Sequence, residues 1–255
     1  MRVSALIGIA GLATTVAAQD APLASARITP CDGRTVSRVE IRRSARTVME
    51  KARAPGWART VLQPLLLGTP TRASAIAPFL QLRDGGPCTE RRRSESERLL
   101  RQLPYLADAT VSVFDETDGT VRIEVETIDD LRPVIGVGLR QSHLNDVELG
   151  NSNIGGSGQL AALRWRDGGA FRDGFGLRYA DYSLLGGPNL AVVNVALTPL
   201  GSFAQYSLGR PFYTELQHAA AYAGYVKDDG YTSFSRTDGD ANRSSRERAD
   251  AGFAF

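Results

Sequence analysis

Apolar and polar residues alternate with a period of two through most of residues 133–255, which predicts β-strands. The alternating runs are centred on residues 135–139, 161–165, 175–179, 191–197, 206–208, 221–225 and 249–255. Turn signals rich in Asp, Gly and Pro separate several of them, at residues 167–169, 186–188, 228–230 and 238–240. The pattern therefore predicts six or seven antiparallel strands in this part of the chain.

Residues 33–130 mix helical and strand patterns. Residues 34–42 predict a strand, and short helical pieces interrupted by Pro and Gly follow. Thr89 is a suitable N-cap for a helix that ends near Leu103. Residues 108–129 alternate on both sides of an Asp-Gly pair at 118–119, which is a hairpin signal. This order of strand, helices and hairpin predicts a small α+β domain with a mixed sheet.

Residues 1–18 predict a secretory signal peptide. Arg2 is followed by an apolar run to Val16 and by small residues up to Ala18. The run is shorter and richer in Ala, Gly and Thr than a membrane-spanning helix, which needs about 20 apolar residues. The alternative is an N-terminal core helix. We expect an exported chain whose mature form begins near Gln19.

Export changes the interpretation of the two cysteines. In an oxidising compartment the pair Cys31 and Cys88 predicts a disulfide. The alternative is two buried thiols. Both cysteines lie beside turn residues, where burial is less common, and this favours the disulfide.

Two environments explain strands that are apolar on one side and small or charged on the other. A soluble sandwich buries the apolar side, whereas a membrane barrel turns it toward lipid. The export signal, the glycines on the polar side and the tyrosines near strand ends favour an antiparallel transmembrane β-barrel. Such a sheet must close on itself, and six or seven strands fall short of the ~8 of the smallest barrels. We therefore expect an incomplete barrel, the N-terminal portion of a longer protein; the alternative is a small eight-stranded barrel that ends at Phe255.

Three segments carry a family resemblance. Residues 79–105, which include Arg-Leu-Leu-Arg-Gln-Leu-Pro-Tyr at 98–105, resemble a POTRA (polypeptide-transport-associated) domain together with the hairpin that follows. Residues 150–160, Gly-Asn-Ser-Asn-Ile-Gly-Gly-Ser-Gly-Gln-Leu, resemble the entry to the barrel of the BamA/TamA superfamily of outer-membrane assembly and translocation proteins. Residues 208–213 resemble a strand end of the same family.

The resemblance implies a POTRA-like periplasmic domain at 33–130 and the N-terminal strands of an outer-membrane β-barrel at 133–255. It implies partners of three kinds: outer-membrane lipid, unfolded or partly folded client polypeptides, and periplasmic accessory proteins. Clients would pair with the strand edge of the POTRA-like sheet and with the first barrel strand. That strand consists of Val134, Ile135, Gly136, Val137, Gly138, Leu139 and Arg140. The alternative is a passive structural or pore-forming barrel with a periplasmic anchoring module.

Composition argues against several other functions. With 30 basic and 28 acidic residues, the net charge of +2 gives no electrostatic support for nucleic-acid binding. Two His and two Cys are too few for the usual metal site. His143 and His218 stand alone, without a nucleophile motif such as Gly-x-Ser-x-Gly. We expect neither an enzyme nor a cofactor, and we expect the acidic pairs at 129–130 and 228–229 to be solvated turns.

Overall fold

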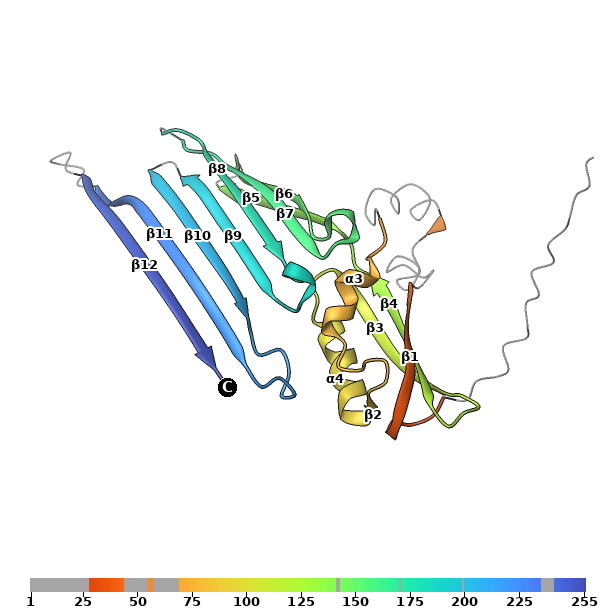
Figure 1. Ribbon diagram of the computed structural model, residues 1–255. Helices are drawn as coiled ribbons and strands as arrows, with labels where there is room; N and C mark the ends of the chain where they lie inside the picture. The colour runs from red at the N-terminus through yellow and green to blue at the C-terminus, as the bar shows by residue number, and fades with distance from the viewer. Residues whose placement is uncertain are drawn as a thin grey trace, which may run out of the picture.

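The computed structural model describes residues 28–43, 55–56, 69–140, 143–169, 171–198, 200–234 and 241–255. The predicted signal peptide and most of the predicted helical pieces between 44 and 68 lie outside these residues. Figure 1 shows an α+β unit at one end of a large antiparallel sheet. None of the helices in the described residues is long and apolar enough to cross a membrane.

The α+β unit has a four-stranded sheet in the order β2-β1-β4-β3, in which β1 runs parallel to β4. Its elements are β1 (Asp32–Arg43), α3 (Ala73–Ile76), η1 (Ala77–Phe79), β2 (Pro87–Thr89), α4 (Glu90–Arg101), β3 (Leu106–Asp115) and β4 (Val121–Asp129). The predicted first strand, the helix capped by Thr89 and the hairpin are all confirmed. The Thr89 side chain accepts a hydrogen bond from the Arg92 amide, and Gly119 has the positive φ of 81° that the hairpin turn requires.

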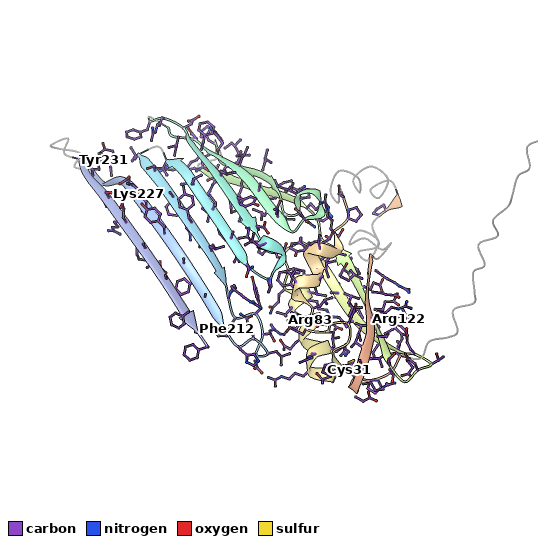
Figure 2. All side chains as sticks on the ribbon, viewed as in Figure 1. Cys31, Arg83, Arg122, Phe212, Lys227 and Tyr231 are labelled. Carbon is purple, nitrogen blue, oxygen red and sulfur yellow. A yellow bond between two sulfur atoms is a disulfide. The ribbon has the colours of Figure 1, made fainter. Side chains whose placement is uncertain are left out.

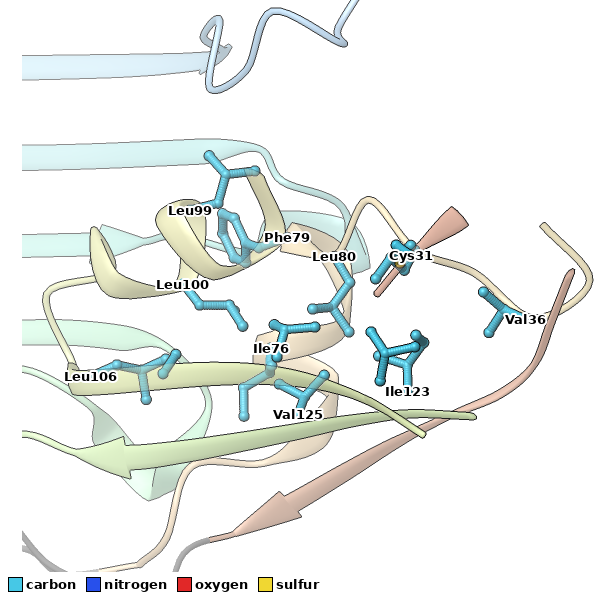
Figure 3. Packing of buried hydrophobic residues seen from close by; sticks show 14 of the residues in the cluster. Cys31, Val36, Ile76, Phe79, Leu80, Leu99, Leu100, Leu106, Ile123 and Val125 are labelled. Atoms are coloured by element: carbon cyan, nitrogen blue, oxygen red, sulfur yellow. The ribbon is translucent and has the colours of Figure 1, made fainter. Parts of the chain in front are cut away.

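Helix α4 packs against one face of this sheet, and the core lies between them (Figure 3). The fully buried side chains include Ile76, Leu100, Ile123 and Val125. Burial of large aliphatic side chains contributes about 1.5–3 kcal/mol each, so this cluster is the main source of stability of the unit. On β4 the opposite face carries Glu124 in an ion pair with Arg42.

The predicted disulfide is confirmed. Cys31 is bonded to Cys88, and both residues are buried at the edge of the core. The bond joins the residue just before β1 to β2, across 57 residues of sequence. A covalent link over such a loop restricts the unfolded chain.

Reduction of the disulfide is expected to lower the free energy of unfolding of the α+β unit by about 2–4 kcal/mol, because the unfolded chain regains the freedom of a long loop. Urea titrations of the full chain with and without a reducing agent measure this. The variant with Cys31→Ser and Cys88→Ser should match the reduced protein and should not respond to reductant. An unchanged urea midpoint on reduction would contradict the prediction.

The second sheet is an eight-stranded antiparallel meander in which each strand pairs with its neighbours in the sequence. Its strands are β5 (Pro133–Arg140), β6 (His143–Asn151), β7 (Gln159–Arg166), β8 (Gly174–Asp181), β9 (Leu190–Thr198), β10 (Gly201–Arg210), β11 (Ala220–Phe234) and β12 (Ala241–Ala254). The predicted count of six or seven was low by at least one. The short helices η2 (Ile154–Gly156) and η3 (Leu184–Gly186) form the β6–β7 and β8–β9 connections.

One turn prediction in this sheet was wrong. Residues 228–230 were expected to form a solvated turn, but they lie inside β11 and pair with β12. The Asp229 carboxylate lies 3.7 Å from the ammonium group of Lys227, so local charge pairing offsets the low strand propensity of this Asp-Asp-Gly stretch. The turn signal at 238–240 lies outside the described residues.

Candidate functional site

One face of the large sheet is apolar across its strands. Residues that pair directly across strands point to the same side, so the register fixes the composition of each face. One directly paired row consists of Ile135, Leu149, Leu163, Leu177 and Val195. Parallel to it, the next row contains Val137, Val147, Trp165, Phe175 and Leu197.

This apolar face is exposed. Ile135 is 68% exposed, Leu163 is 66% exposed and Phe175 is 59% exposed. Apolar side chains at strand centres are normally covered by a second layer in a soluble sandwich. These side chains are exposed in the described structure, and the α+β unit does not cover them. The apolar face therefore needs another apolar environment.

The opposite face is polar and charged. The residues that alternate with the apolar rows include Asp146, Glu148, Arg164 and Arg178. The Arg164 Nε lies 2.7 Å from a carboxylate oxygen of Asp146, and an Arg178 guanidinium nitrogen lies 2.7 Å from Glu148. This face is therefore a network of paired charges that requires access to water.

Glycines on the polar face show which way the sheet curls. A Cβ atom on Gly138 would lie 2.8 Å from the Cβ of Asp146 on the neighbouring strand. At Gly150 it would lie 2.5 Å from the Cβ of Ala162. Side chains converge on the inner side of a curved sheet, so tight approaches that only glycine permits mark that side. The polar face is the concave one, and the apolar face is convex.

The seven residues predicted to bind clients all lie on β5, at one edge of the sheet. Within the described residues β5 pairs with β6 alone, through a register that shifts between Gly138 and Leu139. Because of its two glycines and this irregularity, the pairing register of β5 is weakly specified. The edge position is a finding, while pairing with a client stays a prediction.

The outer edge of the α+β sheet, by contrast, is largely occupied. On β3 the Val111 amide donates to the Glu97 carboxylate at 3.1 Å, and Arg93 donates to the Val111 carbonyl at 3.1 Å. The Thr29 amide donates to the Val113 carbonyl at 3.0 Å. Side chains of α4 and the segment before β1 therefore protect this edge, as native sheets commonly do.

The other edge is occupied as well. The Val36 amide donates to the Gly86 carbonyl, and the Gly85 amide donates to the Val36 carbonyl, each at 2.8 Å. Farther along β1, the Val39 amide donates to the Asp84 carboxylate at 2.8 Å. At these positions the chain already satisfies the backbone groups, so they are not free to pair with a client. Pairing of a client with this sheet stays a prediction.

A buried polar cluster joins the α+β unit to the sheet. We call Thr71, Asp129, Arg132 and Asn153 the junction network. Asp129 accepts from the Thr71 amide and from Arg132, each at 3.0 Å. Arg132 also donates to the Asn153 carbonyl, and the Asn153 amide group donates to the Thr71 hydroxyl at 2.7 Å. The four residues thus tie the start of α3, the end of β4, the linker and the β6–β7 connection together.

The junction network corrects the expectation that Asp129 lies in a solvated turn. Asp129 ends β4, and its partner Arg132 is only 2% exposed. Burial lowers the pKa of the Arg132 guanidinium, and the Asp129 carboxylate opposes that shift. A buried guanidinium needs its carboxylate, so this pair is a structural requirement of the junction.

The glycine-rich stretch at 150–160 docks against the α+β unit. The Arg72 amide donates to the Gly156 carbonyl at 2.8 Å, and a Cβ atom on Gly156 would lie 2.2 Å from the Pro70 carbonyl oxygen. Gly158 packs against the ring of Tyr105, whose hydroxyl donates to the Ala75 carbonyl. Burial raises the pKa of the Tyr105 hydroxyl. In the sequence this stretch resembled a barrel entry, but it gave no sign of the docking.

Helix α4 contacts a second connection of the sheet, residues 211–219 between β10 and β11. Arg98 donates to the Tyr213 carbonyl at 2.6 Å, and Arg91 lies 2.9 Å from the Glu215 carboxylate. The Phe79 and Tyr213 rings meet edge to face, with centroids 5.8 Å apart. The hydrogen bond from Arg98 lowers the pKa of the Glu95 carboxyl, so this pair stays charged at neutral pH.

Catalytic candidates are not brought together. His143 begins β6 at the end of the sheet away from the α+β unit, whereas His218 lies in the β10–β11 connection. In the described residues, no three His, Cys, Asp or Glu side chains are grouped in a way that could hold a metal ion. The expectation that the protein is not an enzyme stays a prediction.

Comparison with known proteins gives likenesses among solved structures but none among sequences. No family model matches the chain, and no curated protein matches it. Among solved structures, BamA from Haemophilus ducreyi lacking POTRA domains 1–3 is similar over 85% of this chain and 43% of that chain. The TM-score is 0.46 and the identity 13%. The chain thus spans less than half the length of that structure.

Proposed function

We propose that this chain is part of an outer-membrane β-barrel protein of the BamA/TamA type, which assists insertion or translocation of client polypeptides through strand pairing at β5. The observation that carries the proposal is a curved sheet with a bare apolar outer face, a charged inner face and a weak strand at its edge. The α+β unit would be a POTRA-like domain in the periplasm.

A lipid environment accounts for both faces at once. An exposed apolar surface of this extent marks a contact with membrane or protein, and a charged concave face suits a water-filled lumen. Strands β5–β10 are 8–10 residues long, against about 9–11 for a tilted strand that crosses a bilayer. On β11, which Figure 2 labels at Lys227, the apolar face becomes charged: Lys227 lies midway along this 15-residue strand and pairs with Glu247.

Strand pairing at β5 follows from the same environment. In lipid every backbone donor and acceptor needs a partner, so the outer edge of β5 must pair with another strand. Gly136 and Gly138 lower the cost of exchanging that partner, because they contribute no side-chain packing to the pairing. A client strand can therefore compete for the edge by main-chain hydrogen bonding, which is β-augmentation.

A photo-crosslinking experiment tests the role of β5. A photoreactive amino acid replaces Val137 in the purified full chain, which is then reconstituted in phospholipid vesicles with an unfolded outer-membrane barrel as the client. We expect a crosslink to the client and faster client insertion than in protein-free vesicles, because β5 lies at the open edge.

The matched control places the same amino acid at Val193, which lies on the same apolar face but in the central strand β9. Position 193 should give no crosslink. Equal crosslinking at both positions, or none at 137, would rule out β5 as the client-pairing edge.

A second candidate is a passive barrel whose α+β unit only anchors or gates it. The backbone groups already bonded on β1 and β3 favour this candidate, since a strand edge that is largely occupied is a poor receiver of extended peptides. Ion conductance across planar bilayers, together with no effect on client insertion, would support it over the first.

A further inference from the structure

A cavity of about 370 Å³ lies between the α+β unit and the β10–β11 connection. Its lining includes Phe79, Arg83 and Leu99 from the α+β unit, and Arg210, Leu216 and His218 from the sheet side. Figure 2 labels Arg83 on the α+β unit and Phe212 on the connection, at the same end of the sheet. The cavity therefore has a mostly polar lining that includes two guanidinium groups.

The walls of this cavity are held in place. Arg98 donates to the Tyr213 carbonyl, and the ring of Tyr213 packs edge to face against Phe79. Thr214, the next residue of the connection, is buried. These contacts fix the connection against helix α4, so the cavity is a built feature of the junction between the two units.

Arg210 marks the end of the apolar face. It is the last residue of β10 and lies on the same side as Tyr206 and Leu208, because alternate residues of a strand share a face. The register confirms the side, since Tyr206 stacks on its cross-strand partner Tyr225 with ring centroids 6.3 Å apart. In the proposed barrel, Arg210 reaches out where the acyl layer gives way to lipid head groups.

The two cavity arginines differ from their neighbours in having no acidic partner. Arg91 pairs with Glu215 and Arg98 pairs with Glu95. In the part of the chain that the structure describes, no ion pair joins Arg83 or Arg210 to a carboxylate. Two uncompensated guanidinium groups beside one cavity attract an anion, and guanidinium binds phosphate oxygens in a bidentate geometry.

We propose that this cavity binds the phosphate of a phospholipid head group, from the leaflet that faces the α+β unit. The inference rests on the proposed membrane location. Arg83 and Arg210 hold the phosphate, while the acyl chains continue over Leu208 on the apolar face. Because one arginine belongs to each unit, a bound lipid fastens the α+β unit to the membrane surface and to the sheet.

Lipid binding to the detergent-solubilised full chain tests the proposal, with native mass spectrometry during titration with phosphatidylglycerol. The variant with Arg83→Gln and Arg210→Gln should bind about 100-fold more weakly, since each charge-assisted hydrogen bond contributes roughly tenfold or more. Each single variant should lose about tenfold. The single variants keep the test decisive if the double variant does not fold.

The matched control is Arg38→Gln with Arg42→Gln, which removes the same total charge from the chain, at two exposed arginines paired with Glu40. Its binding should equal that of the unaltered chain. An equal loss in the control would overturn the proposal, because the effect would then be one of net charge.

Two competitors identify the ligand chemistry. Diacylglycerol with the same acyl chains lacks the phosphate and should not bind, so tight binding of diacylglycerol would overturn the role of the arginines. Inorganic phosphate should not displace the lipid; displacement would show a free-anion site instead.

The lipid test and the crosslinking test can fail separately, because these variants leave strand β5 unchanged. If the chain does not bind phosphatidylglycerol but still gives the crosslink at position 137, this inference is wrong and the proposed function stands.

Discussion

The double variant with Leu163→Arg and Val195→Arg is expected not to insert stably into vesicles. Both side chains lie on the convex apolar face, in strands β7 and β9. An arginine that faces lipid near the bilayer centre costs about 2–4 kcal/mol. Strand β8 separates the two sites, so their costs should add to about 4–8 kcal/mol. This loss is comparable to the unfolding free energy of a typical domain, about 5–15 kcal/mol. Urea titration of the vesicle-inserted protein measures the loss.

The matched control places two arginines on the concave face at the same spacing. Asn194 on β9 and Val226 on β11 are separated by one strand and lie beside charged residues. Arginine at these positions faces water in a lumen, so the variant should insert with little loss of stability. If both double variants lose the same stability, the convex face does not contact lipid. If the unaltered chain stays monodisperse in buffer without detergent, that face is covered by protein.

The sequence predicted the large sheet because its strands repeat a two-residue alternation that is independent of the rest of the fold. The convex face supplies the apolar positions, and the concave face supplies the glycines and charges between them. Strand β6 was missed because its alternation is broken: Asn145 and Asp146 follow Leu144, and the register slips opposite Gly138. A bulge shifts side chains between faces, and a period of two no longer describes such a strand.

The α+β unit was predictable for a different reason. Its hairpin and its capped helix depend on local residues, namely the Asp-Gly turn at 118–119 and Thr89. The parallel pairing of β1 with β4 depends on residues more than 80 positions apart and leaves no local signal. The protected edge of β3 leaves no local signal either. In the sequence, Glu97 and Arg93 resemble solvated residues of a charged helix, and only the fold places β3 beside them.

The junction network was invisible in the sequence because each of its residues has a more common role elsewhere. Asp129 next to another aspartate predicts a turn, and Asn153 in a glycine-rich stretch predicts a loop. Only the three-dimensional contact between two units makes them partners of the buried Thr71 and Arg132. Arg132 directly precedes β5, so the network fixes the base of the strand for which we propose client pairing.

The variant Asp129→Ala is expected to open the junction, because it leaves the buried Arg132 guanidinium without its carboxylate. Removal of one partner of a buried ion pair costs about 3–5 kcal/mol. Hydrogen exchange of the Arg72 amide, which bonds to the Gly156 carbonyl across the junction, reports this directly. The amide should exchange more than about 100-fold faster, given that 1.4 kcal/mol corresponds to a factor of ten.

Two controls separate charge from packing. Asp130→Ala removes the neighbouring carboxylate, which within the described residues accepts from the Leu131 amide and not from the junction network. It should leave the exchange of Arg72 nearly unchanged. The variant with Asp129→Leu and Arg132→Met removes both charges and should recover much of the lost protection, since apolar pairs often replace buried ion pairs at little cost. If this double variant exchanges as fast as Asp129→Ala, the hydrogen bonds to Thr71 and Asn153, rather than the buried charge, hold the two units together. If Asp129→Ala exchanges no faster than the unaltered chain, the junction does not depend on the network at all.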